Sequence, residues 1–225
     1  IEQLKQNIKS YTKVINYCDE GGLIVSGDDP ELGLKILNET RKNFENGKND
    51  KIYLGIDAAS SSLCSGGDEY KWNEFCWTTA QLTKLYQEYA SFYPLISIED
   101  PFYQDSWRPW SELNKKIGDK VWLVGDDLTV TNVKRLKKAK QENAINAVLI
   151  KPNQIGTVTE TITAVKLAKE FGWKIIVSHR SGETNDSFIA DLAYGIAADG
   201  LKAGSPLQNE RLVKYNRLIE IERSV

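Results

Sequence analysis

The chain contains six short runs of apolar residues, and each run ends in a polar or charged side chain. The runs cover residues 52–57, 95–99, 121–126, 147–151, 174–179 and, more weakly, 200–202. Within most of them the apolar residues follow one another, without the alternation that marks a strand with one solvated face. Such runs are typical of strands buried on both faces, as in a parallel sheet.

The segments between these runs have the periodicity of amphipathic helices. Asp29-Pro30-Glu31 offers an N-cap, a proline and an acidic first turn, so we expect a helix to begin at Pro30. The stripes that predict buried helix faces are Leu32, Ile36 and Leu37; Leu82, Leu85, Tyr86 and Tyr89; Thr159, Ile162, Val165 and Leu167; and Leu212, Tyr215, Leu218 and Ile219. Strands that alternate with helices predict a parallel α/β fold.

The alternation continues along the whole chain, so we expect one domain over residues 1–225. No linker, low-complexity tract or change of composition interrupts it. The longest polar stretch, residues 60–73 around Gly66, is expected to be a loop. Such a loop is either a surface excursion or a cover over a functional site.

Composition, net charge and cysteine content exclude several classes of protein. The 225 residues include 41% hydrophobic and 27% charged side chains, as in an ordinary globular chain. With 29 basic against 31 acidic residues the net charge is −2, so we expect no nucleic-acid or membrane-surface partner. No apolar run reaches the roughly 20 residues that a membrane span requires. Three cysteines without metal-site spacing favour a reducing compartment, and we expect a cytoplasmic protein.

The polar residues that end the six runs carry the candidate chemistry. They are Asp57, Glu99, Asp126, Lys151, His179 and Lys202. Their separations are close to the roughly 30 residues of a βαβ unit, so consecutive members can end consecutive strands. If the sheet curls into a barrel, all six side chains meet at the rim formed by the carboxyl ends of the strands. Three carboxylates without clustered histidine or cysteine then favour a hard cation such as Mg²⁺, although each acid taken singly is as well explained as a loop cap or a surface charge.

Three further features have both a catalytic and a structural interpretation. Lys151 follows three apolar residues, and burial of its stem would favour a neutral amine that can take a proton from carbon; otherwise it is an ion-paired lysine. His179 is the only histidine, and a single histidine is commonly structural, but the adjacent Arg180 and Ser181 suit a phosphate or a carboxylate. Glu20 precedes two glycines and belongs either to a simple turn or to a site as a general acid.

Seven motifs, in unbroken order from about residue 10 to residue 222, resemble the enolase family. They are DEGG (19–22), GIDAAS (55–60), SIEDPF (97–102), GDDLTVTN (125–132), LIKPNQIGT (149–157), SHRSGET (178–184) and ERLVKYN (210–216). The resemblance implies an enolase-like (β/α) TIM-type barrel behind a separate N-terminal domain. We expect this chain to be an incomplete barrel of six βα units that lacks the N-terminal domain and the first two barrel strands, and the missing initiator Met indicates a part of a longer polypeptide.

The resemblance also implies a reaction and a role for each candidate residue. The reaction is the reversible, Mg²⁺-dependent dehydration of 2-phosphoglycerate to phosphoenolpyruvate in glycolysis by a lyase, phosphopyruvate hydratase, through a metal-stabilised ene-diolate. The implied catalytic residues are Lys151, the base at C2, and Glu20, on the acid side at C3. The implied metal ligands are Asp57, Glu99 and Asp126, and the implied substrate contacts are His179, Arg180, Ser181, Lys202, Glu99 and Asp126.

Departures from the family pattern leave alternatives open. The family's mobile serine-bearing loop has no counterpart here, so we expect the isolated chain to be poorly active. Glu220 stands where an arginine helps to bridge the family's homodimer, so we do not expect that dimer. One alternative is a non-catalytic, enolase-like scaffold or binding fragment. The intact set of acids and lysines argues against this alternative. The other is a Schiff-base aldolase that uses Lys151, for which a triple-carboxylate metal site has no obvious use.

Overall fold

The centre of the computed structural model, which describes residues 1–46, 51–64 and 67–224, is a sheet of six parallel strands. The strands are β3 (Leu54–Asp57), β6 (Leu95–Glu99), β7 (Trp122–Gly125), β8 (Ala147–Ile150), β9 (Lys174–Ser178) and β10 (Gly200–Lys202). Their order in the sheet is β10-β9-β8-β7-β6-β3, so strands that follow one another along the chain are neighbours. The six runs predicted as strands therefore all form strands of one parallel sheet.

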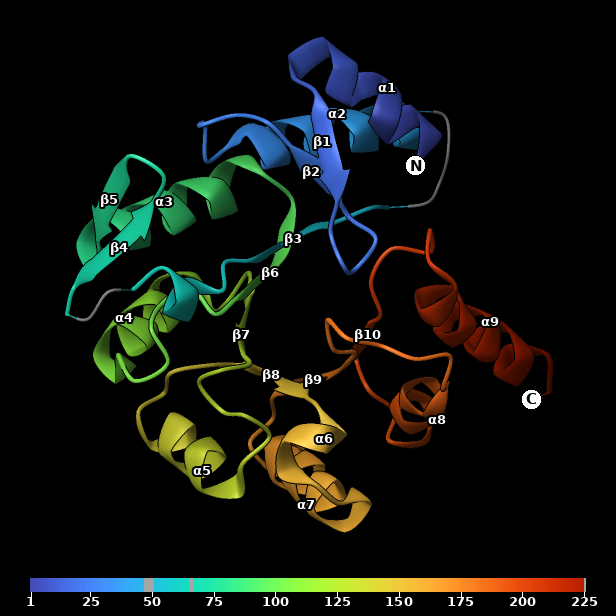
Figure 1. Ribbon diagram of the computed structural model, residues 1–225. Coiled ribbons are helices and arrows are strands. Elements are labelled where there is room, and N and C mark those ends of the chain that lie inside the picture. Colours follow the sequence, from blue (N-terminus) through green and yellow to red (C-terminus); the bar gives the residue numbers. More distant parts are fainter. Residues whose placement is uncertain (47–50, 65–66, 225) are drawn as a thin grey trace.

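Helices surround this sheet and make it the inner wall of a half-barrel (Figure 1). They are α1 (Glu2–Tyr11), α2 (Leu32–Glu45), α3 (Thr79–Phe92), α4 (Trp107–Ile117), α5 (Val133–Gln141), α6 (Pro152–Ile155), α7 (Val158–Glu170), α8 (Phe188–Gly195) and α9 (Asn209–Ser224). None of the helices in the described part of the chain combines the length and the apolar character that a membrane span requires. The arrangement confirms the predicted parallel α/β fold.

Strand β8 shows why these runs lack alternation. All of its residues are buried, and their side chains divide between two apolar clusters. Ala147 and Leu149 pack with Val124 in one cluster, while Val148 and Ile150 join the main core. Since both faces of the strand exclude water, both need apolar side chains, as predicted.

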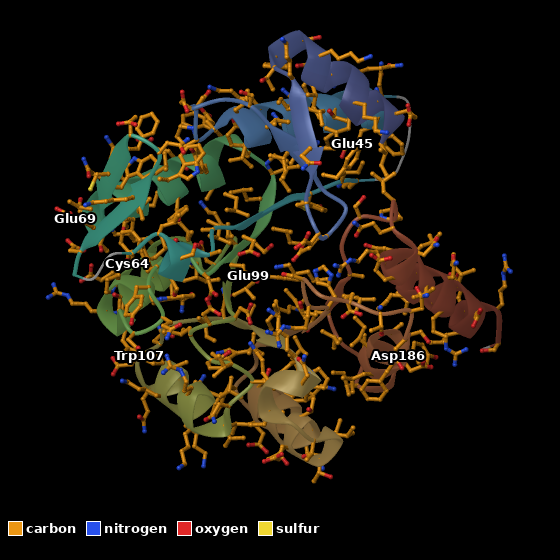
Figure 2. All side chains as sticks on the ribbon, viewed as in Figure 1. Glu45, Cys64, Glu69, Glu99, Trp107 and Asp186 are labelled. Carbon is orange, nitrogen blue, oxygen red and sulfur yellow. The ribbon has the colours of Figure 1, made fainter. Side chains whose placement is uncertain are left out.

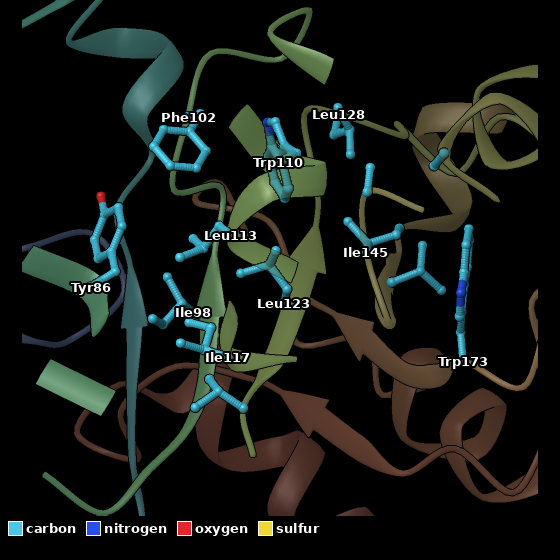
Figure 3. Close-up of a cluster of buried hydrophobic side chains, with 14 of the residues drawn as sticks. Tyr86, Ile98, Phe102, Trp110, Leu113, Ile117, Leu123, Leu128, Ile145 and Trp173 are labelled. Atoms are coloured by element: carbon cyan, nitrogen blue, oxygen red, sulfur yellow. The ribbon is translucent and has the colours of Figure 1, made fainter. Parts of the chain in front are cut away.

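The main core lies between the sheet and the helices outside it (Figure 3). Ile98 of β6 and Leu123 of β7 meet Trp110 and Leu113 of α4 there, and all four side chains are fully buried. Burial of such large side chains is the main stabilising contribution of this layer. It fixes the strands, and with them the positions of their carboxyl ends.

Two antiparallel hairpins lie outside the sheet. They pair β1 (Val14–Tyr17) with β2 (Leu23–Val25), and β4 (Glu69–Trp72) with β5 (Phe75–Thr78). The second hairpin shows that the expected loop over residues 60–73 is wrong in its later part, and Gly66 lies outside the described residues. Tyr70 is fully buried, and the ring of Trp72 in β4 stacks with those of Phe75 and Trp77 in β5, so cross-strand aromatic contacts stabilise this hairpin.

Helix α2 begins at Leu32, two residues after the predicted start at Pro30. The carboxylate of Asp29 accepts a hydrogen bond from the backbone N–H of Glu31 at 2.9 Å. The backbone carbonyl of Asp29 accepts another from the N–H of Leu32 at 3.1 Å. These bonds close a turn at Asp29, and the helix begins only after this turn.

Most of the predicted face of α3 is correct, because Leu82, Tyr86 and Tyr89 are buried. The predicted faces of α2, α7 and α9 are wrong in part, because Leu37, Thr159 and Ile219 are exposed. Helix α9 buries two charged residues, Arg211 and Lys214, along with one apolar residue, Ile221. The inward side of α9 meets polar groups of the site, which supply the partners that buried charged side chains need.

We expect Leu123→Ala to lower the free energy of unfolding by about 2–5 kcal/mol, because a fully buried side chain would leave a cavity. Urea denaturation followed by circular dichroism measures this loss. The control, Phe92→Ala, truncates a side chain that is 76% exposed at the end of α3 and should change the value by less than about 0.5 kcal/mol. Equal losses for the two variants would contradict the position of the core.

Candidate active site

The side chains that end the six strands lie at one rim of the sheet. Asp57, Glu99 and Lys202 are the last residues of β3, β6 and β10, and Asp126, Lys151 and His179 directly follow β7, β8 and β9. Because the strands are parallel, their carboxyl ends share one rim. Figure 2 shows Glu99 near the centre of the ring of helices, where side chains converge.

A polar cavity of about 180 Å³ opens at this rim. Every residue predicted for the site lines it except Glu99, which is joined to it through Lys202. Asp100 and Asp127 also line the cavity, although neither was predicted. Each directly follows a predicted ligand, so the doubled acids at two strand ends are the sequence signal that could have found them.

Lys202 lies between two of the predicted metal ligands. Its ammonium donates to Asp57 Oδ2 at 2.7 Å, and to Glu99 Oε1 and Oε2 at 2.9 and 3.0 Å. Burial alone would lower the pKa of Lys202, but the carboxylates of Glu99 and Asp57 outweigh burial and raise it above its ordinary value. Lys202 is therefore charged, and it holds one acid from the opposite edge strand, β3, and one from the neighbouring strand, β6.

The carboxyl group of Glu99 is buried close to other charged groups of the site. It is 7% exposed, and burial together with the nearby Asp57 raises its pKa to about 7, although Lys202 opposes the shift. One ammonium thus does not offset the crowding of negative charge at this strand end. A cation of higher charge would favour the ionised carboxylates.

Lys151 and Asp126 form a buried ion pair. Lys151 Nζ donates to Asp126 Oδ2, and the two side chains are 12% and 11% exposed. Gln154 Nε2 lies 3.4 Å from the other oxygen of Asp126. The ammonium of Lys151 therefore lies against Asp126, and a second positive partner for Asp126 would compete with this pair.

Asp100 fixes the ends of β6 and β7 relative to each other. Its Oδ1 accepts from the backbone N–H of Asp126 at 3.0 Å, and its Oδ2 from the N–H of Asp127 at 2.8 Å. Its backbone has φ of 43°, a left-handed conformation that is uncommon for a non-glycine residue. Burial raises the pKa of Asp100 to about 8, while the two N–H donors oppose the rise.

Carboxylate oxygens dominate the groups that could hold a metal ion. In the described part of the chain, Asp100, Asp126 and Asp127 form a group of three acids whose ligand oxygens all lie within 4.8 Å of one another. Both oxygens of Asp100 already accept backbone hydrogen bonds, so its free lone pairs are fewer. The predicted set is arranged differently, since Asp57 and Glu99 share Lys202 while Asp126 pairs with Lys151. In both sets the donors are hard oxygens, which fit Mg²⁺ or Ca²⁺ better than zinc.

The turn between β1 and β2 brings Glu20 to the cavity from outside the sheet. The N–H of Ser205 donates to the backbone carbonyl of Glu20 at 2.8 Å, which ties the turn to the segment after β10. Gly204 in that segment has φ of 83°, and a Cβ there would lie 2.9 Å from Glu20 O and 3.0 Å from His179 Cε1. Glycine is therefore required at position 204 for the close approach of Glu20 and His179.

His179 is buried at the inner end of the cavity. Its Nε2 lies 3.3 Å from Glu20 Oε2 without a well-aligned hydrogen bond, and its Nδ1 lies 2.5 Å from Arg211 Nη1. Burial lowers the pKa of His179, Arg211 pushes it the same way, and Glu20 opposes both. The imidazole is therefore neutral near neutral pH.

Arg180 and Ser181 follow His179 at the more open side of the cavity. Arg180 Nη1 donates to Asn153 Oδ1 at 2.9 Å, and its backbone N–H donates to Glu183 Oε1 at 3.1 Å. Ser181 is exposed and lines the same cavity. A guanidinium beside an exposed hydroxyl can bind an anionic oxygen group that enters from solvent.

Two charged residues of α9 support this loop, and the sequence pattern did not indicate them. Lys214 is fully buried and donates to Glu183 Oε2 at 2.7 Å. Arg211 is fully buried and donates to the backbone carbonyls of Arg180 and Ser181, both at 2.7 Å. The clue is their spacing of three residues, which places both on one helical face.

Comparison with known proteins agrees with the resemblance. A family model described as "Enolase, C-terminal TIM barrel domain" matches residues 1–225. The chain is 43% identical over 218 residues to a protein named "Enolase" from Solanum lycopersicum and 44% identical over 218 residues to "Enolase 2" from Hevea brasiliensis. Each match covers 93% of this chain, but only 49% and 48% of those proteins, so the chain spans about half the length of these relatives.

We expect Asp100→Asn to lower the free energy of unfolding by about 1–3 kcal/mol, because the amide would turn a donor toward one of two backbone N–H groups. Urea denaturation measures the change. The same substitution at the exposed Asp119 is the matched control and should be nearly neutral. A neutral result at both positions would show that Asp100 does not fix the two strand ends.

Proposed function

The chain belongs to the enolase family, and on that premise we propose that it carries the residues for the reversible dehydration of 2-phosphoglycerate to phosphoenolpyruvate. This is the hydro-lyase reaction of phosphopyruvate hydratase, a step of glycolysis. The observation that carries the proposal is that Lys151 and Glu20, the proposed base and acid, line one cavity although they come from β8 and from the β1–β2 turn.

We assign the metal site to Asp57, Glu99 and Asp126, with Mg²⁺ as the ion. Burial and the nearby acids, which together raise the pKa of Glu99 to about 7, support a cation there, and an all-oxygen set favours a hard one. When bound, Mg²⁺ supplies positive charge that stabilises the negative charge developing on the substrate carboxylate. A cation at Asp126 would also free Lys151 from its ion pair.

Lys151 is the proposed base. Its Nζ takes the proton from C2 of 2-phosphoglycerate, and the electron pair of the C–H bond moves into the substrate carboxylate. This proton is very weakly acidic, so positive charge near the carboxylate is required. Lys202, held by Asp57 and Glu99, is the proposed protein cation on that side.

Glu20 is the proposed acid, and His179 its neighbour. The electron pair returns to form the C2–C3 double bond, the C3–O bond breaks, and the leaving hydroxide takes a proton from Glu20 to depart as water. Glu20 is the more exposed of the two side chains, at 38% against 1%, so it can exchange its proton with solvent. Reversal of the same transfers gives the hydration reaction.

Arg180 and Ser181 are the proposed contacts of the substrate phosphate. The guanidinium offers paired donors, and the hydroxyl offers one more, on the open side of the cavity. His179 completes the pocket at its inner end. Phosphate binding at this side would orient C2 toward Lys151, which is the main requirement for proton transfer.

The proposal includes a cytoplasmic protein with a small-molecule substrate and with no nucleic-acid or membrane partner. The net charge of −2 supports the absence of a nucleic-acid partner. At position 220, where the family has a dimer-bridging arginine, Glu220 accepts from Arg217 of its own helix at 3.0 Å. We therefore propose no family-type dimer contact there.

We expect the chain to catalyse Mg²⁺-dependent exchange of the C2 proton of 2-phosphoglycerate in heavy water, and Lys151→Met to slow this exchange by at least about 100-fold. Exchange needs the base and the cation but not the acid, so it remains measurable by proton NMR where full turnover is low. Lys134→Met, at an exposed position of α5, is the matched control and should leave exchange unchanged.

Glu20→Gln separates the two proposed roles within this experiment. It should retain most of the C2 exchange while it slows formation of phosphoenolpyruvate, followed by its ultraviolet absorbance. No exchange by the unmodified chain, or the same exchange rate in Lys151→Met, would overturn the assignment of Lys151 as the base.

We expect Asp57→Asn to weaken Mg²⁺ binding by at least about tenfold in isothermal titration calorimetry, because it removes one of three proposed ligands. Asp127→Asn, at the same rim, removes an acid outside this set and should have a smaller effect. The opposite order would assign the metal to the cluster of Asp100, Asp126 and Asp127, and the proposed ligand set would be wrong.

A further inference from the structure

Arg211, in the first turns of α9, joins three separate segments of the site. Its guanidinium donates to the backbone carbonyls of Asp19, Arg180 and Ser181 at 2.8, 2.7 and 2.7 Å. One of its nitrogens also lies 2.5 Å from Nδ1 of His179. Arg211 thereby links the turn that carries Glu20, the loop after β9 and the only histidine of the chain.

The guanidinium fixes which nitrogen of His179 carries the proton. Arginine has donors and no acceptor, so Nδ1 must accept and must be unprotonated. In a neutral imidazole the proton then resides on Nε2, and this nitrogen lies 3.3 Å from Glu20 Oε2. The proton therefore lies on the ring nitrogen that is next to Glu20, the proposed acid.

The burial of Arg211 argues for more than a structural role. It is fully buried, its Nε has no hydrogen-bond partner among the described residues, and within the same part of the chain no carboxylate oxygen lies within 4.0 Å of its guanidinium nitrogens. A buried guanidinium without a carboxylate is costly, and an apolar residue would often be the more stable choice. Its cost is explained if its charge and its donors are needed at the site.

We propose that Arg211 is a positioning residue that holds His179 as the neutral Nε2–H tautomer and keeps its Nε2 next to Glu20. The part of this role that concerns the dehydration rests on the proposed function, but the tautomer itself does not. Packing supports this placement, because a Cβ on Gly204 would lie 3.0 Å both from Arg211 Cδ and from His179 Cε1. Arg211 and His179 therefore both pack closely against the backbone at Gly204.

The test is imidazole ¹⁵N NMR of the full chain, in which one histidine gives an unambiguous signal. We expect the unmodified chain to show Nε2–H and an unprotonated Nδ1 near neutral pH. Arg211→Met should lower the ratio of this tautomer to the other by about tenfold, the contribution of one hydrogen bond to a charged group. Arg211→Lys keeps a cationic donor and should lie nearer to the unmodified chain.

A pH titration of the same signal gives a second readout. The charged groups that act on His179 are Glu20 from the β1–β2 turn, Arg211 from α9, Lys202 from β10 and Glu183 from the loop after β9. Arg211→Met removes a cation and leaves Glu20 in place, so the pKa of His179 should rise. Lys214→Met is the matched control, because it removes another buried cation of α9 that does not touch His179, and it should leave the tautomer ratio unchanged.

The outcomes separate this inference from the proposed function. An Nδ1–H or charged imidazole in the unmodified chain would overturn the inference, even if the Arg211 variants fail to fold. The inference would also be overturned if the Arg211→Met variant were less stable but kept the original tautomer ratio, because the role of Arg211 would then be structural. If the tautomer depends on Arg211 but 2-phosphoglycerate with Mg²⁺ leaves the His179 signal unmoved, the inference holds and the proposed function fails.

Discussion

The structure depends on one electrostatic constraint, the pairing of opposite charges at the carboxyl ends of a parallel sheet. Lys202, on the last strand, bonds to Asp57 on the first, 145 residues earlier, and to Glu99 beside it. The strand at each edge of the half-barrel is thus held at its end by the other edge. Parallel strands bring these charges together, and a charge at a partly buried rim needs a partner of opposite sign or hydrogen bonds to the backbone.

The groups around the cavity satisfy this constraint in three ways. Lys151 and Lys202 use carboxylates, Asp100 uses two backbone N–H groups, and Arg211 uses backbone carbonyls. Backbone partners cannot move away without a change of the fold, whereas ion-paired side chains can exchange partners. The first kind of contact therefore suits residues that position others, and the second kind suits residues that act on a substrate or a metal ion.

The errors of the sequence-based predictions have a common physical origin. Apolar periodicity reports burial in an apolar layer, so it predicted the strands and most of the face of α3 correctly. It failed on α9, where the buried residues Arg211 and Lys214 are charged, because their partners come from distant loops. It also missed the β4–β5 hairpin, where contacts between aromatic rings of two strands replace an apolar run.

The sequence by itself determined the six strands, their parallel order, the family and the residues at the strand ends. The strands and the residues at their ends are set by local runs of side chains, and the parallel order and the family follow from the order of such runs and motifs along the chain. The tertiary structure alone decided which charges pair with which, that Asp100 holds two backbone N–H groups, and that Arg211 reaches His179. Hydrogen bonds and ion pairs act over a few ångströms between residues far apart in the chain, and only the folded sheet sets those distances.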